Sequence, residues 1–267
     1  MTAATPADAG LRETFDRVAS DYDAVRPGYP DALLQDIVRM TGLSPADAVL
    51  EVGCGTGQAT VPFARRGHPM VCLDIGANML AVASRNCRDY PGVQFVCEAF
   101  ESWNARDRTF ALVLSATAFH WVPAEVRYAR AASALANGGH LAIVVNYHPR
   151  PYTEFFTRVQ TVYKRVVPEW GDPGDRASAE ERIAEHVDQI DRIGLFDAVA
   201  VRQYPWSRAY TAVDYVRLLN TYSGHIALPC ATRRELFAGV TDIIDGEFGG
   251  SIVRPYLSVL FLARIRE

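Results

Sequence analysis

Three glycines at alternate positions, Gly53, Gly55 and Gly57, constrain the fold of this chain more than any other feature. They follow an apolar run that ends at Val52, and residues 58–66 after them are compatible with a helix. A strand, a glycine turn and a helix in this order bring bare backbone up to a ligand, because glycine has no Cβ to hold the ligand away. The segment therefore predicts a ligand-binding turn in an α/β sheet.

Two carboxylates accompany this turn. Glu51 lies two residues before the first glycine, and Asp74 ends a second apolar run about twenty positions further on. A carboxylate at such a strand end can accept hydrogen bonds from ribose hydroxyls, so we expect a nucleoside ligand. Dinucleotide sites use the spacing G-x-G-x-x-G, and here Gln58 stands where the third glycine would be. A nicotinamide-dependent oxidoreductase is therefore a disfavoured alternative.

Apolar runs alternate with helical patterns along most of the chain. Continuous apolar strands between helices indicate a parallel sheet covered on both faces, which makes the predicted fold class α/β. Strands are expected at residues 48–53, 69–74, 93–98, 110–116, 140–147, 197–207 and 256–265. Helices are expected at residues 58–66, 77–88, 123–136, 153–167, 178–193, 211–222 and 232–247. Leu11, Phe15, Val18 and Tyr22 recur at helical spacing and predict an amphipathic helix before the sheet.

The motif Glu51-x-Gly53-x-Gly55-x-Gly57, followed by a strand that ends in Asp74, resembles motifs I and II of the class I S-adenosylmethionine (SAM) methyltransferases. The stretch from Phe15 to Pro27 resembles the N-terminal signature of small-molecule methyltransferases. Ala118-Phe119-His120-Trp121, with Asn137-Gly138-Gly139 further on, resembles the branch that includes trans-aconitate methyltransferases. The resemblance covers most of residues 11–147. It implies a Rossmann-like, mostly parallel sheet of seven strands with the last antiparallel, and SAM as cofactor with S-adenosylhomocysteine (SAH) as product.

We expect four segments along the chain. Residues 1–10 read as a short disordered lead. Residues 11–147 hold N-terminal lid helices and the SAM-binding core, residues 148–196 form an inserted helical cap, and residues 197–267 complete the sheet.

The resemblance also assigns cofactor-binding positions. The glycines, with Glu51 before them, lie under the methionyl and ribose parts of SAM, and Asp74 holds the ribose hydroxyls. Ile75 and Met79 flank the adenine or pack as an ordinary helix face, and Ala99, Phe100 and Glu101 read the adenine or form a plain loop. Ser115 and Ala116 end a strand beside the switch point of the sheet, where their backbone could meet the methionyl amine. Tyr22 and Arg26 close over the cofactor, with Arg26 on its carboxylate, or are a packing tyrosine and a surface arginine.

His120 is the candidate catalytic residue. An imidazole titrates near neutral pH, so His120 could remove a proton from the acceptor, orient it, or simply form a wall of the pocket. Candidate acceptor-binding residues are aromatic, a residue type that packs in cores more often than in sites. They are Tyr29, Trp121, Tyr147, Trp170, Trp206 and Tyr222.

Composition narrows the class of protein. The formal net charge is −4 and no basic block occurs, which argues against nucleic acid as a partner. The five cysteines form no C-x-x-C pair, so neither a metal site nor a disulfide framework is expected, and reduced thiols favour a cytoplasmic location. No apolar run is long enough for a membrane span, and residues 1–10 do not read as a signal peptide. Lys164 is the only lysine, a bias that suits a GC-rich bacterial genome.

We therefore expect an enzyme that transfers a methyl group from SAM to a small organic molecule, such as a carboxylate or a secondary metabolite. A SAM-binding protein without catalysis is the non-enzymatic alternative, because the glycine motif is the same in both. The sequence indicates neither the acceptor nor the oligomeric state.

Overall fold

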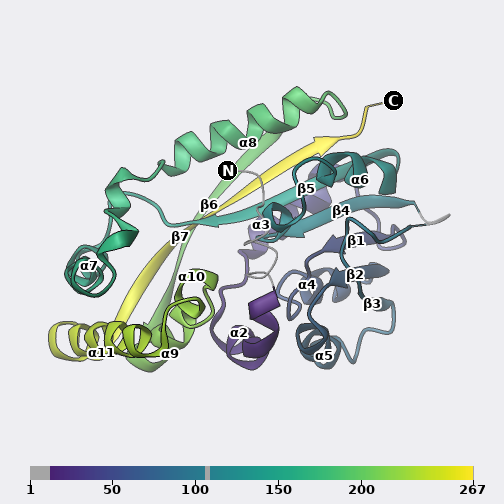
Figure 1. Ribbon diagram of the computed structural model, residues 1–267. Helices are drawn as coiled ribbons and strands as arrows, with labels where there is room; N and C mark the ends of the chain where they lie inside the picture. The colour runs from purple at the N-terminus through teal and green to yellow at the C-terminus, as the bar shows by residue number, and fades with distance from the viewer. Residues whose placement is uncertain (1–12, 106–108, 267) are drawn as a thin grey trace.

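The computed structural model describes residues 13–105 and 109–266 (Figure 1). The disordered lead predicted for residues 1–10 lies outside this part. Within it, one seven-stranded sheet has the order β3-β2-β1-β4-β5-β7-β6. The strands are β1 (Val49–Val52), β2 (Met70–Asp74), β3 (Val93–Cys97), β4 (Phe110–Ala116), β5 (Leu135–Tyr147), β6 (Ala200–Thr211) and β7 (Ser251–Arg264).

Strands β1 to β5 run parallel, and β7 runs antiparallel to both β5 and β6. This topology confirms the Rossmann-like sheet with an antiparallel last strand. The strand order reverses between β1 and β4, so the carboxyl ends of these two strands flank a crevice of the kind in which α/β sheets bind ligands.

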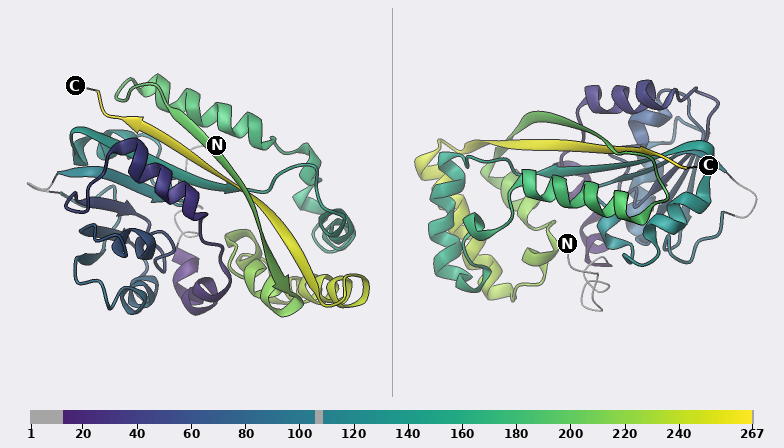
Figure 2. Two further views of the ribbon diagram at one scale, coloured as in Figure 1. Left: turned by 180° about the vertical axis from the view of Figure 1, so that it is seen from behind. Right: turned by 90° about the horizontal axis from the view of Figure 1, so that it is seen from above.

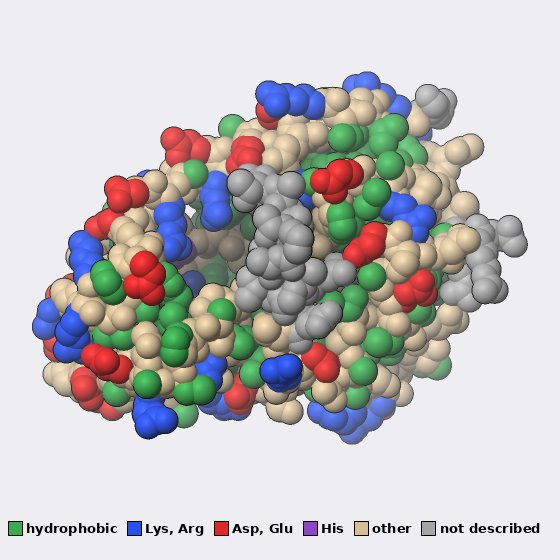
Figure 3. Space-filling model, in the orientation of Figure 1, with side chains coloured by type: hydrophobic (Ala, Val, Ile, Leu, Met, Phe, Trp, Pro, Cys, Tyr) green, Lys and Arg blue, Asp and Glu red, His purple; other side chains and the backbone are tan. Residues whose placement is uncertain are grey.

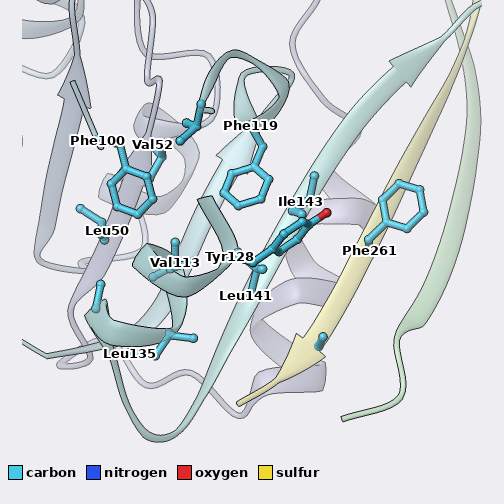
Figure 4. Packing of buried hydrophobic residues seen from close by; sticks show 14 of the residues in the cluster. Leu50, Val52, Phe100, Val113, Phe119, Tyr128, Leu135, Leu141, Ile143 and Phe261 are labelled. Atoms are coloured by element: carbon cyan, nitrogen blue, oxygen red, sulfur yellow. The ribbon is translucent and has the colours of Figure 1, made fainter. Parts of the chain in front are cut away.

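Successive residues of the central strands pack into two different cores, one on each face of the sheet. On one face, Leu50, Val113 and Ile143 pack under α6 (Arg127–Ala134) and α8 (Ala179–Ile193) (Figure 4). On the other, Val49, Leu112 and Val144 pack under α3 (Asp31–Thr41), α4 (Thr60–Ala64) and α5 (Ala77–Asn86). Burial on both faces is the reason that Met70 to Leu73 of β2 read as a continuous apolar run rather than an alternating one.

Two short helices precede α3, where the sequence predicts one amphipathic helix. Residues Glu13–Val18 form a 3-10 helix, η1, and Ala19–Val25 form α2. Phe15 and Tyr22 still share a face, which packs against Met79 and Val82 of α5. In Figure 1, α2 lies between α5 and α9 (Ala212–Leu219).

Strands β6 and β7 extend beyond the rest of the sheet as a two-stranded ribbon. Residues 257–264 of β7 pair with β5, whereas residues 251–256 pair with β6 alone. Helices α7 (Glu154–Val166), α9 and α11 (Cys230–Glu247) pack together at the far end of the ribbon, near α10 (Ser223–Ile226) (Figure 2). The helical cluster thus combines α7 with helices from the C-terminal segment, and the predicted segment boundaries stay a prediction.

The ends of some elements differ from the predicted ranges. Strand β7 begins at Ser251 rather than residue 256, directly after Gly249 and Gly250, whose positive φ angles turn the chain after α11. Helix α8 begins as predicted, with a capping box between Ser178 and Glu181. Within the described residues, no helix is both long enough and apolar enough to cross a membrane.

Candidate active site

A cavity of about 280 Å³ opens at the carboxyl ends of β1, β2 and β4. The glycine turn and Asp74 line one side, and residues of η1 and α2 line another. The loop after β4, including His120 and Trp121, completes the wall. Segments from the start and middle of the chain thus meet at the crevice that the strand order creates.

The glycines of the turn all have positive φ angles, from 57° at Gly55 to 98° at Gly57. Gly53 also has no room for a side chain, because a Cβ there would overlap the Cβ of Ala118. The loops after β1 and β4 are therefore in direct contact. Gly53 and Gly55 line the cavity, whereas Gly57 faces Ala83 and Thr60 and does not.

Asp74 lines the cavity with both carboxylate oxygens held by backbone. Oδ2 accepts a hydrogen bond from the Gly55 N–H and Oδ1 accepts one from the Gly76 N–H, each at 2.9 Å. Burial raises the pKa of Asp74, although these N–H groups act in the opposite direction. A carboxylate offers about four lone-pair positions, so oxygens that each hold one N–H donor can still accept hydroxyl donors from a ligand.

Asp16 joins the N-terminal helices to the wall of the cavity. Its Oδ1 accepts hydrogen bonds from the backbone N–H groups of Asn78 and Met79, at 2.7 and 3.2 Å, and its Oδ2 accepts one from Asn78 Nδ2 at 2.9 Å. A residue from η1 therefore caps the first turn of α5, where a carboxylate also complements the helix dipole. Asp16 lines the cavity and was missed among the candidate site residues.

Arg26 and Tyr22, two of the predicted cofactor-binding residues, both line the cavity. The Arg26 guanidinium lies between two rings, 4.8 Å from the centroid of Tyr22 and 4.4 Å from that of Tyr222. Its Nε donates to Thr221 Oγ1 at 2.9 Å and its Nη2 to the Thr221 carbonyl at 2.6 Å. Arg26 thus binds α2 to the segment between α9 and α10, and its pairing with a cofactor carboxylate stays a prediction.

The remaining cofactor candidates divide between the cavity and the protein interior. Those that line the cavity are Ile75, Met79, Ala99, Phe100, Glu101 and Ala116. Glu51 does not reach it: the side chain is buried, and its Oε2 accepts a hydrogen bond of 2.6 Å from Thr60 Oγ1. Burial raises the pKa of Glu51 to about 8. Ser115 is also buried, and its hydroxyl donates to the Val52 carbonyl at 2.8 Å.

Thr117 is a second lining residue that was missed. It has a φ of 59° in a non-glycine residue, immediately after β4. Its hydroxyl is 3.0 Å from that of Tyr29, a predicted acceptor-binding residue that lies outside the cavity lining. A strained backbone directly before Ala118 sets the close contact with Gly53, and strain of this kind gathers at functional sites.

His120 lies in a short 3-10 helix, η2 (Phe119–Trp121), and lines the cavity. Burial, and then the positive charge of Arg127 and other basic side chains, lower the pKa of His120 to about 4. The imidazole is therefore neutral at pH 7 and can accept a hydrogen bond, although the lowered pKa makes it a weaker base than an ordinary histidine. Trp121 also lines the cavity, where its ring packs against Phe15 at 5.6 Å between centroids.

Most of the remaining aromatic candidates line a second cavity, which has a volume of about 270 Å³. Tyr147 and Trp170 line only this second cavity, and Tyr222 lines both. Trp206 lines neither: it stacks on Tyr256 at 4.9 Å and donates its Nε1–H to Ser258 Oγ at 2.8 Å. Its ring packs within the β6–β7 ribbon and outside both cavities, so we correct its assignment to the acceptor site.

Comparisons with known proteins agree with this geometry. Residues 49–139 match the sequence family described as a methyltransferase domain. Malonyl-(acyl-carrier protein) O-methyltransferase of Marinomonas sp. (strain MWYL1) is 34% identical over 113 residues, and the match spans 42% of each protein, less than half of that relative. Demethylmenaquinone methyltransferase of Tropheryma whipplei (strain Twist) is 28% identical over 232 residues, which cover 79% of this chain and 92% of that protein.

A solved structure has the same fold with little sequence identity. It is Phospholethanolamine N-methyltransferase 2 of Haemonchus contortus in complex with phosphomonomethylethanolamine and S-adenosylhomocysteine. The TM-score is 0.54 at 18% identity, over 94% of this chain and 58% of that one.

Proposed function

We propose that this chain, which belongs to the class I SAM-dependent methyltransferases, transfers a methyl group to a small organic molecule bound beside His120. One observation carries the proposal. The glycine turn and Asp74 form one part of the wall of a single cavity of about 280 Å³. His120, together with residues of η1 and α2, forms another part of the same wall. A cofactor and an acceptor can therefore meet in one cavity.

The residues of this cavity fit SAM. Asp74 faces the cavity with lone pairs left for ribose hydroxyls. Gly55 forms a cradle that a side chain would fill, because a Cβ there would stand 3.5 Å from Met79 and 3.7 Å from Tyr22, which line the same cavity. These observations support a nucleoside that lies against the turn with its ribose on Asp74.

The other lining residues have roles consistent with their positions. Ile75, Met79 and Phe100 would flank the adenine, with Ala99 and Glu101 at its edge. The backbone of Ala116 and the guanidinium of Arg26 would hold the methionyl end, and Tyr22 would cover it. Glu51, Gly57 and Ser115 would act indirectly, by fixing the shape of the turn from the interior.

SAM, when bound, supplies a methyl group that its sulfonium already activates, so the protein has mainly to position the acceptor and exclude water. The aromatic rings of Phe15, Tyr22 and Trp121 close the cavity toward η1 and α2. His120 is neutral and can accept a hydrogen bond from an acceptor O–H or N–H. It can then take that proton as the new bond to carbon forms.

The two alternative functions make different predictions. A nicotinamide-dependent oxidoreductase would bind NADH in this cavity, although the turn lacks the third glycine of dinucleotide sites. A SAM-binding protein without catalysis would bind SAM and SAH but would not consume SAM. His120 in the lining favours the enzyme over this second alternative. We also propose a cytoplasmic location, because Cys54, Cys72 and Cys87 are buried as free thiols.

The test is a turnover assay with methyl-labelled SAM and a panel of small hydroxy, amino and carboxylic acids. We expect label in one class of acceptor, with formation of SAH in equal amount. Asp89→Asn changes an exposed carboxylate that does not line the cavity, and this control variant should turn over like the wild type. Binding of NADH with no binding of SAM or SAH would overturn the proposed function.

A further inference from the structure

The second cavity has no role in the function proposed so far. It lies between the end of β5, helix α7, the start of α8, helices α9 and α10, and strand β7. Figure 3 shows a hollow in this region, with Lys and Arg side chains on its rim. Its volume, about 270 Å³, is close to that of the first cavity and large enough for part of a small organic molecule.

The charged side chains that line this cavity all have one sign. Four arginines line it, Arg150, Arg176, Arg182 and Arg254, and the lining contains no aspartate or glutamate. Two of these arginines hold the loop that covers the cavity. Arg150 Nη2 donates to the carbonyls of Pro173, Gly174 and Arg176 at 2.7 to 3.1 Å, and Arg176 Nη2 donates to that of Trp170 at 3.3 Å.

Arg254 differs from the other three arginines, because its guanidinium lies among tyrosine rings in the protein interior. It comes from the part of β7 that pairs only with β6, and its Nε is buried without a hydrogen-bond partner. Its guanidinium is surrounded by rings, 5.0 Å from the centroid of Tyr256, 5.7 Å from Tyr222 and 6.0 Å from Tyr215. Among the described residues, no carboxylate forms an ion pair with it. Ring faces compensate a buried cation only in part, and an anion would complete its environment.

The two histidines beside Arg254, His148 and His225, carry no charge at neutral pH. Burial, and then the charge of Arg254, lower the pKa of His148 and of His225 to about 4, so both rings are neutral at pH 7. His225 Nε2 is 2.8 Å from the Tyr163 hydroxyl. The Nε2 atom of His148 is buried with no partner, like Nε of Arg254. Two residues that line the same cavity therefore each carry one buried polar atom without a hydrogen-bond partner.

Tyr222 connects this cavity to the active site. It lines both cavities, and its ring is contacted by the guanidinium of Arg26 at 4.4 Å and by that of Arg254 at 5.7 Å. The two spaces are therefore one side chain apart. An acceptor whose reactive atom is beside His120 can extend past Tyr222 toward Arg254.

We propose that the second cavity binds an anionic group of the methyl acceptor, a carboxylate or a phosphate, with Arg254 as its charged anchor and Tyr222 as the boundary with the site of methyl transfer. The inference rests on the proposed function, because it names the acceptor class of the same site. The aromatic lining, which includes Phe156 and Trp170, favours an acceptor that carries an apolar or aromatic body as well as the charge.

The test is calorimetric titration of the SAH-saturated protein with benzoate, phenyl phosphate and citrate, and with neutral benzyl alcohol for comparison. We expect at least one of the anions to bind about tenfold more tightly than benzyl alcohol or better. Arg254→Gln should remove this preference, and Arg254→Lys should retain most of it. Arg202→Gln, which changes an exposed arginine of β6, is the matched control and should leave the preference unchanged.

The relative affinities of the three anions distinguish a phosphate site from a carboxylate site. Tighter binding of phenyl phosphate identifies a phosphate site, and tighter binding of benzoate or citrate a carboxylate site. Equal affinity for anions and benzyl alcohol in the wild type, or an unchanged preference in Arg254→Gln, would overturn the inference. SAH affinity is measured first in each protein, and failure of the wild type to bind SAH would instead contradict the proposed function.

A second measurement does not depend on the folding of a variant. Crystals of the wild type with SAH are soaked separately with 4-iodobenzoate and with 4-iodophenyl phosphate, and the anomalous signal of iodine locates each probe. Iodine from either probe in the cavity lined by Arg254 supports the inference. Iodine elsewhere, or no bound iodine, with both probes contradicts it.

Discussion

The Arg26 guanidinium donates two hydrogen bonds to Thr221, one to its hydroxyl at 2.9 Å and one to its carbonyl at 2.6 Å, across 195 positions of the chain. This contact joins α2 to the segment between α9 and α10, at the boundary of the two cavities. It is reinforced by Arg208, which donates to the carbonyls of Arg26 and Ala24 at 2.9 and 3.1 Å. The C-terminal end of α2, which helps to cover the active site, is therefore held by arginines.

Arg26→Met should loosen this cover. The variant keeps the apolar stem but loses both hydrogen bonds to Thr221, so we expect faster amide hydrogen exchange in residues 19–30 and about tenfold weaker SAH binding. In the wild type, SAH should slow the exchange of the same residues. Arg17→Met, a change on the exposed face of η1, is the control. Identical exchange with and without SAH would show that α2 is a fixed packing helix rather than a lid.

The lowered pKa of His120 predicts the acid limit of the reaction. Its folded-state pKa, about 4, lies below the ordinary value of 6.5, so the neutral imidazole persists down to about pH 4. We expect activity that depends on His120 to remain constant between pH 6 and 8. His120→Gln should lower turnover by roughly 10²-fold or more while SAH affinity stays unchanged. An inflection near pH 6.5 that disappears in the variant would contradict the structural assignment, and wild-type turnover in the variant would exclude His120 from the chemistry.

Glu51 predicts a pH-dependent stability. Burial raises its folded-state pKa to about 8 from an ordinary value of 4.5, so the protonated form is favoured in the native state. Its contribution is complete below pH 4.5 and is lost as the pH rises through 8. Glu51→Gln, which cannot titrate, should therefore gain stability relative to the wild type between pH 5 and 8, by on the order of a few kcal/mol.

Urea unfolding at both pH values measures this difference. The exposed Glu235→Gln of α11 is the control, and its unfolding curve should shift with pH in parallel with that of the wild type. Parallel behaviour of Glu51→Gln as well would show that Glu51 is ionised in the folded protein.

Gly53→Ala should be costly for two separate reasons. The φ of 71° is unfavourable for alanine, and the new Cβ would overlap that of Ala118. We expect a loss of about 2–4 kcal/mol in the free energy of unfolding. Adding Ala118→Gly should recover the part due to overlap and leave the part due to φ. Gly246→Ala, in α11 with no atom within 4 Å of the new Cβ, should instead be neutral or slightly stabilising.

Local patterns carried enough information to predict the sheet and one half of the active site. The turn from Gly53 to Gly57 and the strand that ends at Asp74 are continuous in sequence, and their chemistry depends on the residues next to them. The direction of the Glu51 side chain was also available from the sequence. Side chains alternate along a strand, so Glu51 shares the face of Val49, which is covered by α3 and α4, rather than facing the end of the sheet.

The other half depends on contacts that no local pattern records. Asp16 reaches Asn78 across 62 positions, and the strain at Thr117 appears only when the loops after β1 and β4 meet. Arg254 is one arginine within a strand of otherwise ordinary pattern, and its buried charge becomes evident only when α7 and α9 cover it. Trp206 shows the reverse: a candidate by residue type that the pairing of β6 with β7 assigns to a stack with Tyr256.

The most direct test of the whole account is calorimetric titration of SAH into the wild type and into Asp74→Asn. We expect one SAH site per chain in the wild type and an affinity roughly 10- to 100-fold weaker in Asp74→Asn, because the amide loses the charge-assisted hydrogen bonds to the ribose hydroxyls. Asp89→Asn should bind like the wild type. Equal SAH affinity in Asp74→Asn and the wild type, or no SAH binding to either, would contradict the assignment of this cavity as the cofactor site.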